Sequence, residues 1–196
     1  MELGDLLLNG TNRVEIIPPD EPCAAINAEY YQADDSTAFG MLITQSGGVC
    51  ADGVVRLLGS NCDPEYRDIS MFNVKFGGGG YIIFGDDIFG GIFALNIGLL
   101  FDCVGNVIYF APDTLEFEDL EIKPSGLFEF LKNGDIHSFY GQFSSEEYEE
   151  LRAMNVGFNK VLHILPPQWS AEFKTEKHDV RAIDIYEHYR LNFAQP

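Results

Sequence analysis

Two adjacent acids, Asp86 and Asp87, are the residues of this chain whose type and spacing most invite chemistry. They stand in the stretch FGDDIFGGIFALN, before a pair of glycines and between strongly apolar segments. Paired carboxylates could bind a divalent cation or act as a general acid and base. A metal ion would need further oxygen ligands, which Asn96 and Asp102 could supply, although the chain contains neither an EF-hand pattern nor an HExxH motif.

A structural interpretation of the same stretch is a β-hairpin with a polar tip. Neighbouring residues of a strand point to opposite faces, so the two carboxylates would converge only if the backbone turned there. Asp is common in turns, and Gly90 and Gly91 permit one. We therefore predict an exposed hairpin. Its partner-binding residues are expected to be Asp86, Asp87, Asn96 and Asp102.

The other residues that could do chemistry form no catalytic constellation. The histidines are scattered, and no Ser or Cys stands in a GxSxG elbow. His163 lies in an apolar run and Trp169 follows two prolines, so we expect both in the core. The glycines at 77–80 lack the residues of a phosphate-binding loop and predict a plain loop before a strand. The sequence thus predicts no catalytic residue, no metal site and no cofactor, and it favours a protein that is not an enzyme.

The four cysteines have neither CxxC spacing nor a Cys/His ligand pattern, so we expect free, mostly buried thiols; they are Cys23, Cys50, Cys62 and Cys103. The start of the chain, MELGDLLLNG, has no basic region before an apolar run and does not resemble a signal peptide. No apolar run reaches the roughly 18 residues of a transmembrane helix. We therefore expect a cytoplasmic protein with reduced thiols.

The charge balance is the strongest global signal. Thirty-one acids against twelve Lys and Arg give a formal net charge of −19. Such a chain repels phosphate backbones and anionic membranes, which argues against nucleic-acid or membrane binding. It attracts a basic protein and speeds that encounter at low salt. Solubility alone is the competing explanation of the charge. The sequence carries no signal of oligomeric state.

The elements that must position these residues follow from turn signals and periodicity. At 196 residues the chain suits one domain spanning 1–196. Asp20 is a candidate N-cap for a helix over 21–32. Extended segments are expected at 12–20, 38–45, 47–53, 54–60, 81–84, 92–98, 106–112 and 115–120, with a strand or loop at 158–169. Helices are expected at 125–133, after Ser144 or Ser145, and over 179–195.

This order predicts an α+β fold. Strands that follow one another along the chain pair most simply as antiparallel neighbours. We expect a single, mainly antiparallel twisted sheet. Helices from the N- and C-terminal parts of the chain are expected to pack on it.

Several blocks of the sequence resemble an uncharacterised bacterial family of unknown function. FGDDIFGGIFALN matches the family stretch D-D-x-x-G-G-x-F-A-L/I-N, and GNVIYFAPDTLE matches G-N-V-Y-Y-F-A-P-D-S/T-L-E. Upstream, SGGVCADGVVRLLGS and VEIIPPD resemble T-G-G-I-L-x-D-x-G-W-L-R-I/L-L-G-S and V-E-V-L-P. The chain departs from the family at Ile108 and Phe117, where Tyr and Trp are usual. The resemblance covers most of the chain.

The order of these blocks is more distantly similar to the SUKH superfamily, many of whose members are thought to be immunity proteins that block toxins. This resemblance implies a SUKH-like α+β fold and a binding role without catalysis. We therefore expect a non-catalytic interaction protein, of the toxin-neutralising type, that binds a basic partner through its acidic surface. The alternative is a metal-binding or small-ligand-binding protein, or an enzyme, that uses Asp86 and Asp87.

Overall fold

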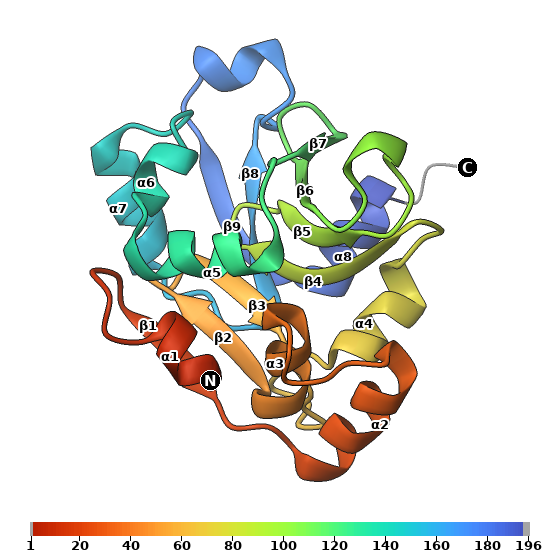
Figure 1. Ribbon diagram of the computed structural model, residues 1–196. Coiled ribbons are helices and arrows are strands. Elements are labelled where there is room, and N and C mark those ends of the chain that lie inside the picture. Colours follow the sequence, from red (N-terminus) through yellow and green to blue (C-terminus); the bar gives the residue numbers. More distant parts are fainter. Residues whose placement is uncertain (1, 194–196) are drawn as a thin grey trace.

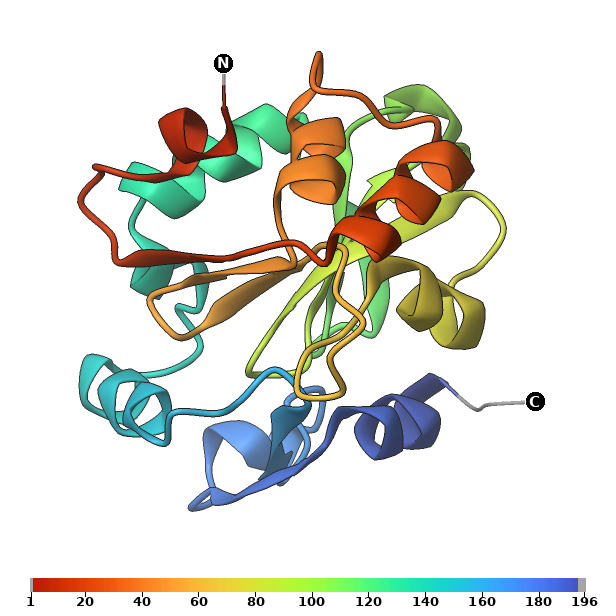
Figure 2. The same ribbon diagram turned by 90° about the horizontal axis from the view of Figure 1, so that it is seen from below.

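A computed structural model describes residues 2–193 of the protein. Residue 1 and residues 194–196 lie outside the described part, and with them the last residues of the helix expected over 179–195. The described chain forms three layers, in which a large sheet lies between a layer of helices and a layer that combines a small sheet with further helices (Figures 1 and 2).

The helices are α1 (Leu3–Leu7), α2 (Glu21–Tyr31), α3 (Ala38–Gln45), α4 (Ile69–Phe76), α5 (Pro124–Asn133), α6 (Ile136–Phe139), α7 (Ser145–Ala153) and α8 (Ile185–Phe193), with 3-10 turns η1 (Phe101–Cys103) and η2 (Ala171–Lys174). The strands are β1 (Val14–Ile17), β2 (Gly48–Ala51), β3 (Val55–Leu58), β4 (Tyr81–Asp87), β5 (Ile92–Asn96), β6 (Val107–Ala111), β7 (Glu116–Asp119), β8 (Lys160–Leu165) and β9 (Asp179–Asp184).

Within residues 2–193, strands β1 to β7 form one sheet of seven strands in sequence order, and each strand is antiparallel to the next. This meander confirms the predicted α+β fold with a mainly antiparallel sheet. Strands β8 and β9 form a separate antiparallel pair. Most connections are short, because an antiparallel neighbour can be reached by a tight turn.

Several local expectations are confirmed by the capping geometry. The Asp20 carboxylate accepts a hydrogen bond from the Cys23 N–H at 3.1 Å and so starts α2. The Ser144 hydroxyl accepts from the Glu147 N–H at 3.3 Å and starts α7. Gly90, with a φ of 100°, takes the left-handed conformation in the turn between β4 and β5.

Two expectations about secondary structure are wrong. Residues 38–45 form α3 and not a strand, and the first part of 179–195 forms β9 before α8 begins. Met41, Leu42 and Ile43 follow one another and are all buried, so helix α3 is apolar on several sides. A short, fully apolar run cannot be assigned by periodicity alone. For β9, the partner that makes it a strand is β8, the preceding strand, from which residues 166–178 with η2 separate it.

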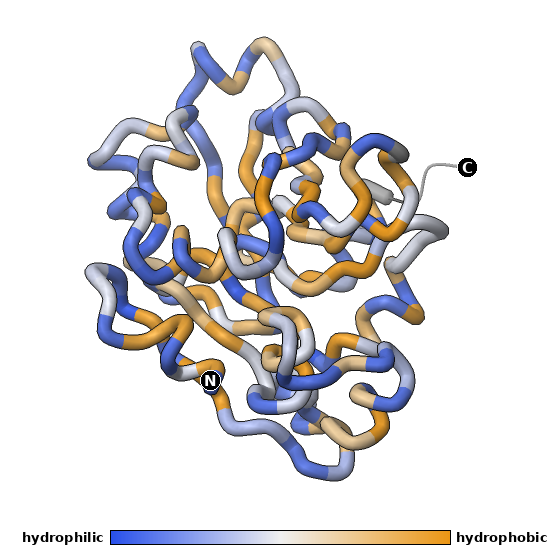
Figure 3. The backbone as a smooth tube through the Cα atoms, in the orientation of Figure 1, coloured by the Kyte–Doolittle hydropathy of each residue, from blue (hydrophilic) through white to orange (hydrophobic). Residues whose placement is uncertain are grey.

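The core fills both sides of the large sheet. On one face, Phe39 of α3 contacts Phe84 of β4 with ring centroids 5.9 Å apart. On the other, the Leu162 N–H of β8 donates to the Ile88 carbonyl at 2.8 Å. Figure 3 shows the resulting pattern, with hydrophobic segments in the central strands and hydrophilic ones in the outer loops. The middle strands are therefore buried on both faces, which makes any polar side chain on them a buried one.

Candidate functional site

The acid pair lies at the end of β4 and not in a turn. Asp86 and Asp87 are both fully buried, at 0% exposure. They pair with Arg56 and Val55 of β3, and the turn follows over residues 88–91. The prediction that they are exposed partner contacts is therefore wrong. The physical reason is that β4 is an inner strand of a sheet covered on both faces, so its last residues are covered too.

Asp86 is the centre of a buried ion cluster. Its Oδ1 accepts from Arg56 Nε at 2.9 Å and from an Arg67 guanidinium nitrogen at 2.9 Å, while its Oδ2 accepts from the other Arg67 nitrogen at 2.6 Å. The side chains of both arginines are at most 1% exposed. Arg67 thus binds the carboxylate with two parallel hydrogen bonds, the strongest geometry for this pair.

Arg56 also connects the large sheet to the small one. Its remaining N–H groups donate to the carbonyls of Gly157 at 2.9 Å, Lys160 at 2.6 Å and Asp87 at 3.1 Å. Lys160 is the first residue of β8. These hydrogen bonds, with the one to Asp86, offset the hydration that the buried Arg56 cation has lost. The cluster therefore links the large sheet to the small sheet and stabilises their packing.

Asp87 points to the opposite face and is held by different donors. Its Oδ1 accepts from the N–H groups of Phe89 at 2.8 Å and Gly91 at 3.0 Å, and its Oδ2 accepts from the Tyr109 hydroxyl at 2.7 Å. Burial raises the pKa of this carboxyl above its usual value, and burial beside Asp87 raises the pKa of Tyr109 well above its own. Gly91 makes the approach possible, because a Cβ there would lie 2.0 Å from the Tyr109 oxygen.

This geometry does not support metal binding or acid–base catalysis by the acid pair. Asp86 and Asp87 point to opposite faces of the sheet, and the oxygens of both carboxylates already accept hydrogen bonds from the protein. A cation would have to displace those donors inside the core, at the cost of leaving them unpaired. Asp86 and Asp87 shape the fold; the chemistry that their spacing suggests would need a solvent-exposed turn.

Asn96 and Asp102 do not join the acid pair. Asn96 is fully buried at the opposite end of the same hairpin, where it pairs with Tyr81 while Asp86 pairs with Ile92. Its side chain accepts from the Leu100 N–H at 3.2 Å and donates to the Leu100 carbonyl at 2.7 Å, which organises the following loop. Of the four predicted contact residues, only Asp102 is exposed. The four do not form one site.

The cationic partners of Asp86 are the residues that the sequence interpretation missed. Arg56 did leave a signal, because a single arginine inside the apolar strand VVRLLGS has to be paired when that strand is buried. Arg67 left none, since it lies in a polar segment where an exposed arginine is expected. Its burial comes only from the path of the chain before α4.

The histidine and tryptophan predictions are overturned in part. Trp169 is 55% exposed and is no core residue. His163 is half-buried, with its ring centroid 5.8 Å from that of His188. Burial and the nearby His163 lower the pKa of His188 to about 4, so this side chain is neutral at pH 7. His178 instead bonds to Glu147 and to the Phe173 carbonyl.

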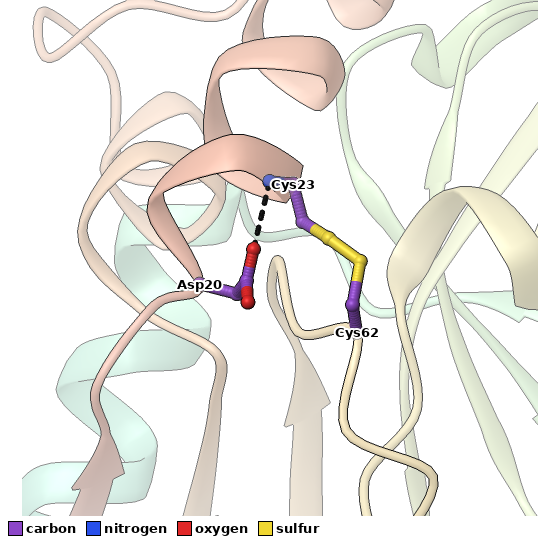
Figure 4. Close-up of side chains that lie close together, drawn as sticks. All are labelled: Asp20, Cys23 and Cys62. Atoms are coloured by element: carbon purple, nitrogen blue, oxygen red, sulfur yellow. Dashed lines mark hydrogen bonds between the residues drawn. A yellow bond between two sulfur atoms is a disulfide. The ribbon is translucent and has the colours of Figure 1, made fainter.

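Two of the cysteines are paired, contrary to the prediction of four free thiols. Cys23 and Cys62 form a disulfide, whereas Cys50 and Cys103 are free. The pair lies where α2 begins beside the segment after β3, next to Asp20 (Figure 4). A separation of 39 residues gives no sequence signal, and the contact exists only because the chain folds back.

The comparisons with known proteins identify the family. Residues 1–188 match the model of a family described as a protein of unknown function, DUF2625. The chain belongs to this family. Two uncharacterised bacterial proteins resemble it: Escherichia coli YbfG, 31% identical over 176 residues that cover 87% of this chain and 81% of that protein, and a Haemophilus influenzae protein, 26% identical over 197 residues that cover 95% and 85%. No solved structure matches.

The predicted membership of a family of unknown function is thus confirmed, and the SUKH likeness stays a prediction. The two main family blocks meet in space at the β4–β5 turn and at the end of β6. There, Phe89 and Gly90 of the first block and Phe110 and Pro112 of the second line a small pocket of about 100 Å³. The exposed Trp169 forms part of its wall.

No helix among residues 2–193 is long and apolar enough to cross a membrane.

The raised pKa of Asp87 predicts how its amide variant behaves. A group whose pKa is higher in the folded than in the unfolded protein stabilises the fold below the unfolded value, and this contribution is lost as the pH rises through the folded value. Asn at this position cannot ionise, so Asp87→Asn does not lose this stability as the pH rises. Its amide oxygen can still accept the hydrogen bonds from the N–H groups of Phe89 and Gly91. In urea unfolding, we expect a stability within about 1 kcal/mol of wild type at neutral pH.

The pH series is the decisive measurement for Asp87. The free energy of unfolding of Asp87→Asn relative to wild type should rise as the pH increases from below the ordinary Asp value of 3.8. All other acids are shared by both proteins, so the difference isolates this carboxyl. A difference that stays constant across the acid range would show that burial does not shift the pKa of Asp87.

Proposed function

We propose that this protein is a non-catalytic interaction protein that binds a basic protein through its acidic surface, and that its partner is a toxin which it neutralises. The observation that carries the proposal is the net charge of −19 together with the structural use of the acid pair. Two of the twelve basic side chains, Arg56 and Arg67, are buried around Asp86. The equally buried Asp86 and Asp87 match them in number, so burial leaves the acidic excess of the chain at the surface.

The acidic surface includes a concave region between α7 and the segment around η2. This concavity has a volume of about 910 Å³. Its acidic lining residues are Asp113, Glu146, Glu147, Glu150 and Glu176. Lys174 and Lys177 also line it, and His178 is paired with Glu147. Acids therefore outnumber lysines here, which suits a partner that presents Lys or Arg.

An apolar pocket adjoins the acidic concavity. Gln168 lines both, and Trp169 and Leu115 stand exposed at the pocket. Exposed aromatic side chains beside a pocket are typical anchoring points of protein interfaces. An apolar pocket beside a row of carboxylates fits a basic partner that inserts one apolar side chain.

The proposed role requires no chemistry from this chain. An inhibitor of this kind acts by covering its target, and opposite charges speed the encounter. The proposal includes a cytoplasmic location, where a protein would protect its own cell. The alternative of a metal or small-ligand site at Asp86 and Asp87 is not favoured, because both carboxylates are buried and hydrogen-bonded.

The test is capture on the immobilised protein from a lysate of its host, followed by kinetics with the purified partner. We expect a basic protein whose association rate falls steeply between about 0.01 M and 1 M ionic strength, as the Debye length shrinks from about 30 Å to about 3 Å. Co-expression with this chain should relieve the toxicity of that partner. Retention of no basic protein, or association insensitive to salt, would contradict the proposal.

Charge reversal locates the surface. Glu146→Lys with Glu150→Lys should slow association about tenfold or more, because rim charges act mainly on the association rate. Glu29→Lys with Glu21→Lys on α2 is the matched control, since both glutamates are exposed helix residues on another side of the fold. Equal slowing by both pairs would mean that net charge and not this concavity guides the encounter.

A further inference from the structure

The start of α2 gathers three side chains that are potential ligands of a metal ion. One donor atom each from Asp20, Cys23 and Cys62 lies within 4.8 Å of the others. Figure 4 shows the Asp20 carboxylate beside the first turn of α2, with the two sulfurs joined as a disulfide next to it. In the described part of the chain, no other group of three or more His, Cys, Asp and Glu side chains is this close.

Hydrogen bonds that do not depend on the disulfide hold the start of α2 against the segment that contains Cys62. The Asp20 N–H donates to the Ser60 carbonyl at 2.9 Å. The Asn27 amide, further along α2, donates to the Ser60 hydroxyl at 3.0 Å and to Asp68 at 2.7 Å. Asn27 and Ser60 are buried. Reduction of the disulfide would therefore leave the two thiols facing each other beside Asp20.

Reduction changes the chemistry of the site from a cross-link to a ligand set. A thiol reductant supplies two electrons and two protons, breaks the S–S bond and is itself oxidised to a disulfide, leaving Cys23 and Cys62 as thiols. Two thiolates and one carboxylate are ligands that Zn²⁺ accepts, with water in the fourth tetrahedral position. Binding expels the two thiol protons to solvent and changes no oxidation state.

We propose that Asp20, Cys23 and Cys62 form a redox-controlled binding site for Zn²⁺ or a similar thiophilic divalent cation. The reduced protein binds the cation, and the disulfide form does not, because both sulfurs are then bonded to each other. Cys62 is exposed and gives the ion access, while Cys23 is buried at the helix start.

The two other cysteines of the chain do not form an equivalent site. Cys50 and Cys103 are also free to ligate, but neither belongs to a group of three such side chains among the described residues. Asp20 has a second role as the N-cap, in which one carboxylate oxygen accepts from the Cys23 N–H. Its other oxygen is the one available to the ion.

The experiment uses the full chain in two redox states. One sample is reduced and desalted under anaerobic conditions, and the other is kept oxidised; both are titrated with Co²⁺ and then with Zn²⁺. We expect thiolate-to-cobalt absorption that saturates at a single equivalent in the reduced sample, disappears when Zn²⁺ is added, and never forms in the oxidised sample. Absence of this absorption in the reduced, folded protein would overturn the proposal.

Three variants assign the ligands. Cys62→Ser should weaken Zn²⁺ binding at least about a hundredfold, and Asp20→Asn about tenfold, a range set by typical losses around metal sites. Asn is as good an N-cap as Asp, so Asp20→Asn removes the ligand and keeps the helix start. Cys50→Ser is the control and should bind as wild type. Unchanged binding by Cys62→Ser, with circular dichroism showing each variant folded, would also overturn the site.

Discussion

Asp86→Asn is expected to lower the free energy of unfolding by about 3–5 kcal/mol, the cost of breaking a buried ion cluster by removing one partner. The neutral amide leaves Arg56 and Arg67 as two cations without an anion between them, in a place where both are at most 1% exposed. The amide also presents N–H groups toward guanidinium donors, where no hydrogen bond can form. The substitution should therefore be among the most damaging in the protein.

Thermal and urea unfolding measure this effect, with Asp102→Asn as the matched control. Asp102 is exposed, so its substitution should change stability by no more than about 0.5 kcal/mol. For a chain of this length, each kcal/mol corresponds to about 2–4 °C in Tm. An Asp86→Asn protein as stable as the control would show that the ion cluster does not stabilise the fold. A functional role for the Asp86 carboxylate would then have to be considered again.

The contrast with Asp87 is part of the same expectation. Asp87 accepts hydrogen bonds from two backbone N–H groups and a tyrosine hydroxyl, none of them charged. An amide oxygen can accept the same backbone bonds, so Asp87→Asn should be tolerated where Asp86→Asn is not. The same substitution at two adjacent aspartates is therefore expected to have different effects on stability, because their hydrogen-bond donors differ.

Loss of the Cys23–Cys62 disulfide is expected to cost about 4 kcal/mol of stability in the chain-entropy model, given the 39-residue separation of the two cysteines. The bond restricts the unfolded chain, and its removal gives that chain more freedom while the folded contacts of α2 remain. Unfolding of wild type with and without a reductant measures the cost. Cys62→Ser should unfold like the reduced wild type.

The control for this measurement is the reductant added to Cys62→Ser, which has no disulfide to lose among the described cysteines. Reduction should leave its stability unchanged. If wild type also fails to respond to the reductant, the two cysteines are not cross-linked in solution. Zn²⁺ added to the reduced wild type should restore part of the lost stability, because a ligand that binds only the folded protein stabilises it.

The sequence determined the overall class of this protein. Turn residues and alternating apolar segments predicted an α+β fold with a mainly antiparallel sheet. Asp20 and the pair Ser144 and Ser145 marked the starts of two helices, of which Ser144 is the observed cap. The family blocks predicted membership of a family of unknown function, which the match over residues 1–188 confirms. These signals are local, so each can be recognised without knowing what the segment will pack against.

Other features of the structure depended on contacts between distant parts of the chain. Residues 38–45 carry a short apolar run, and only their packing against the sheet decided that they form a helix. The pairing of Cys23 with Cys62 arose in the same way, from the fold and not from spacing.

The acid pair shows the division most clearly. The sequence determined that Asp86 and Asp87 stand before a glycine turn, and their type suggested an exposed, chemically active loop. Only the tertiary structure decided that they are buried, one bound by Arg67 from another segment and the other by Tyr109 of another strand. A carboxylate's role depends on which donors reach it and on whether water does, and those conditions are set by the packing of distant segments.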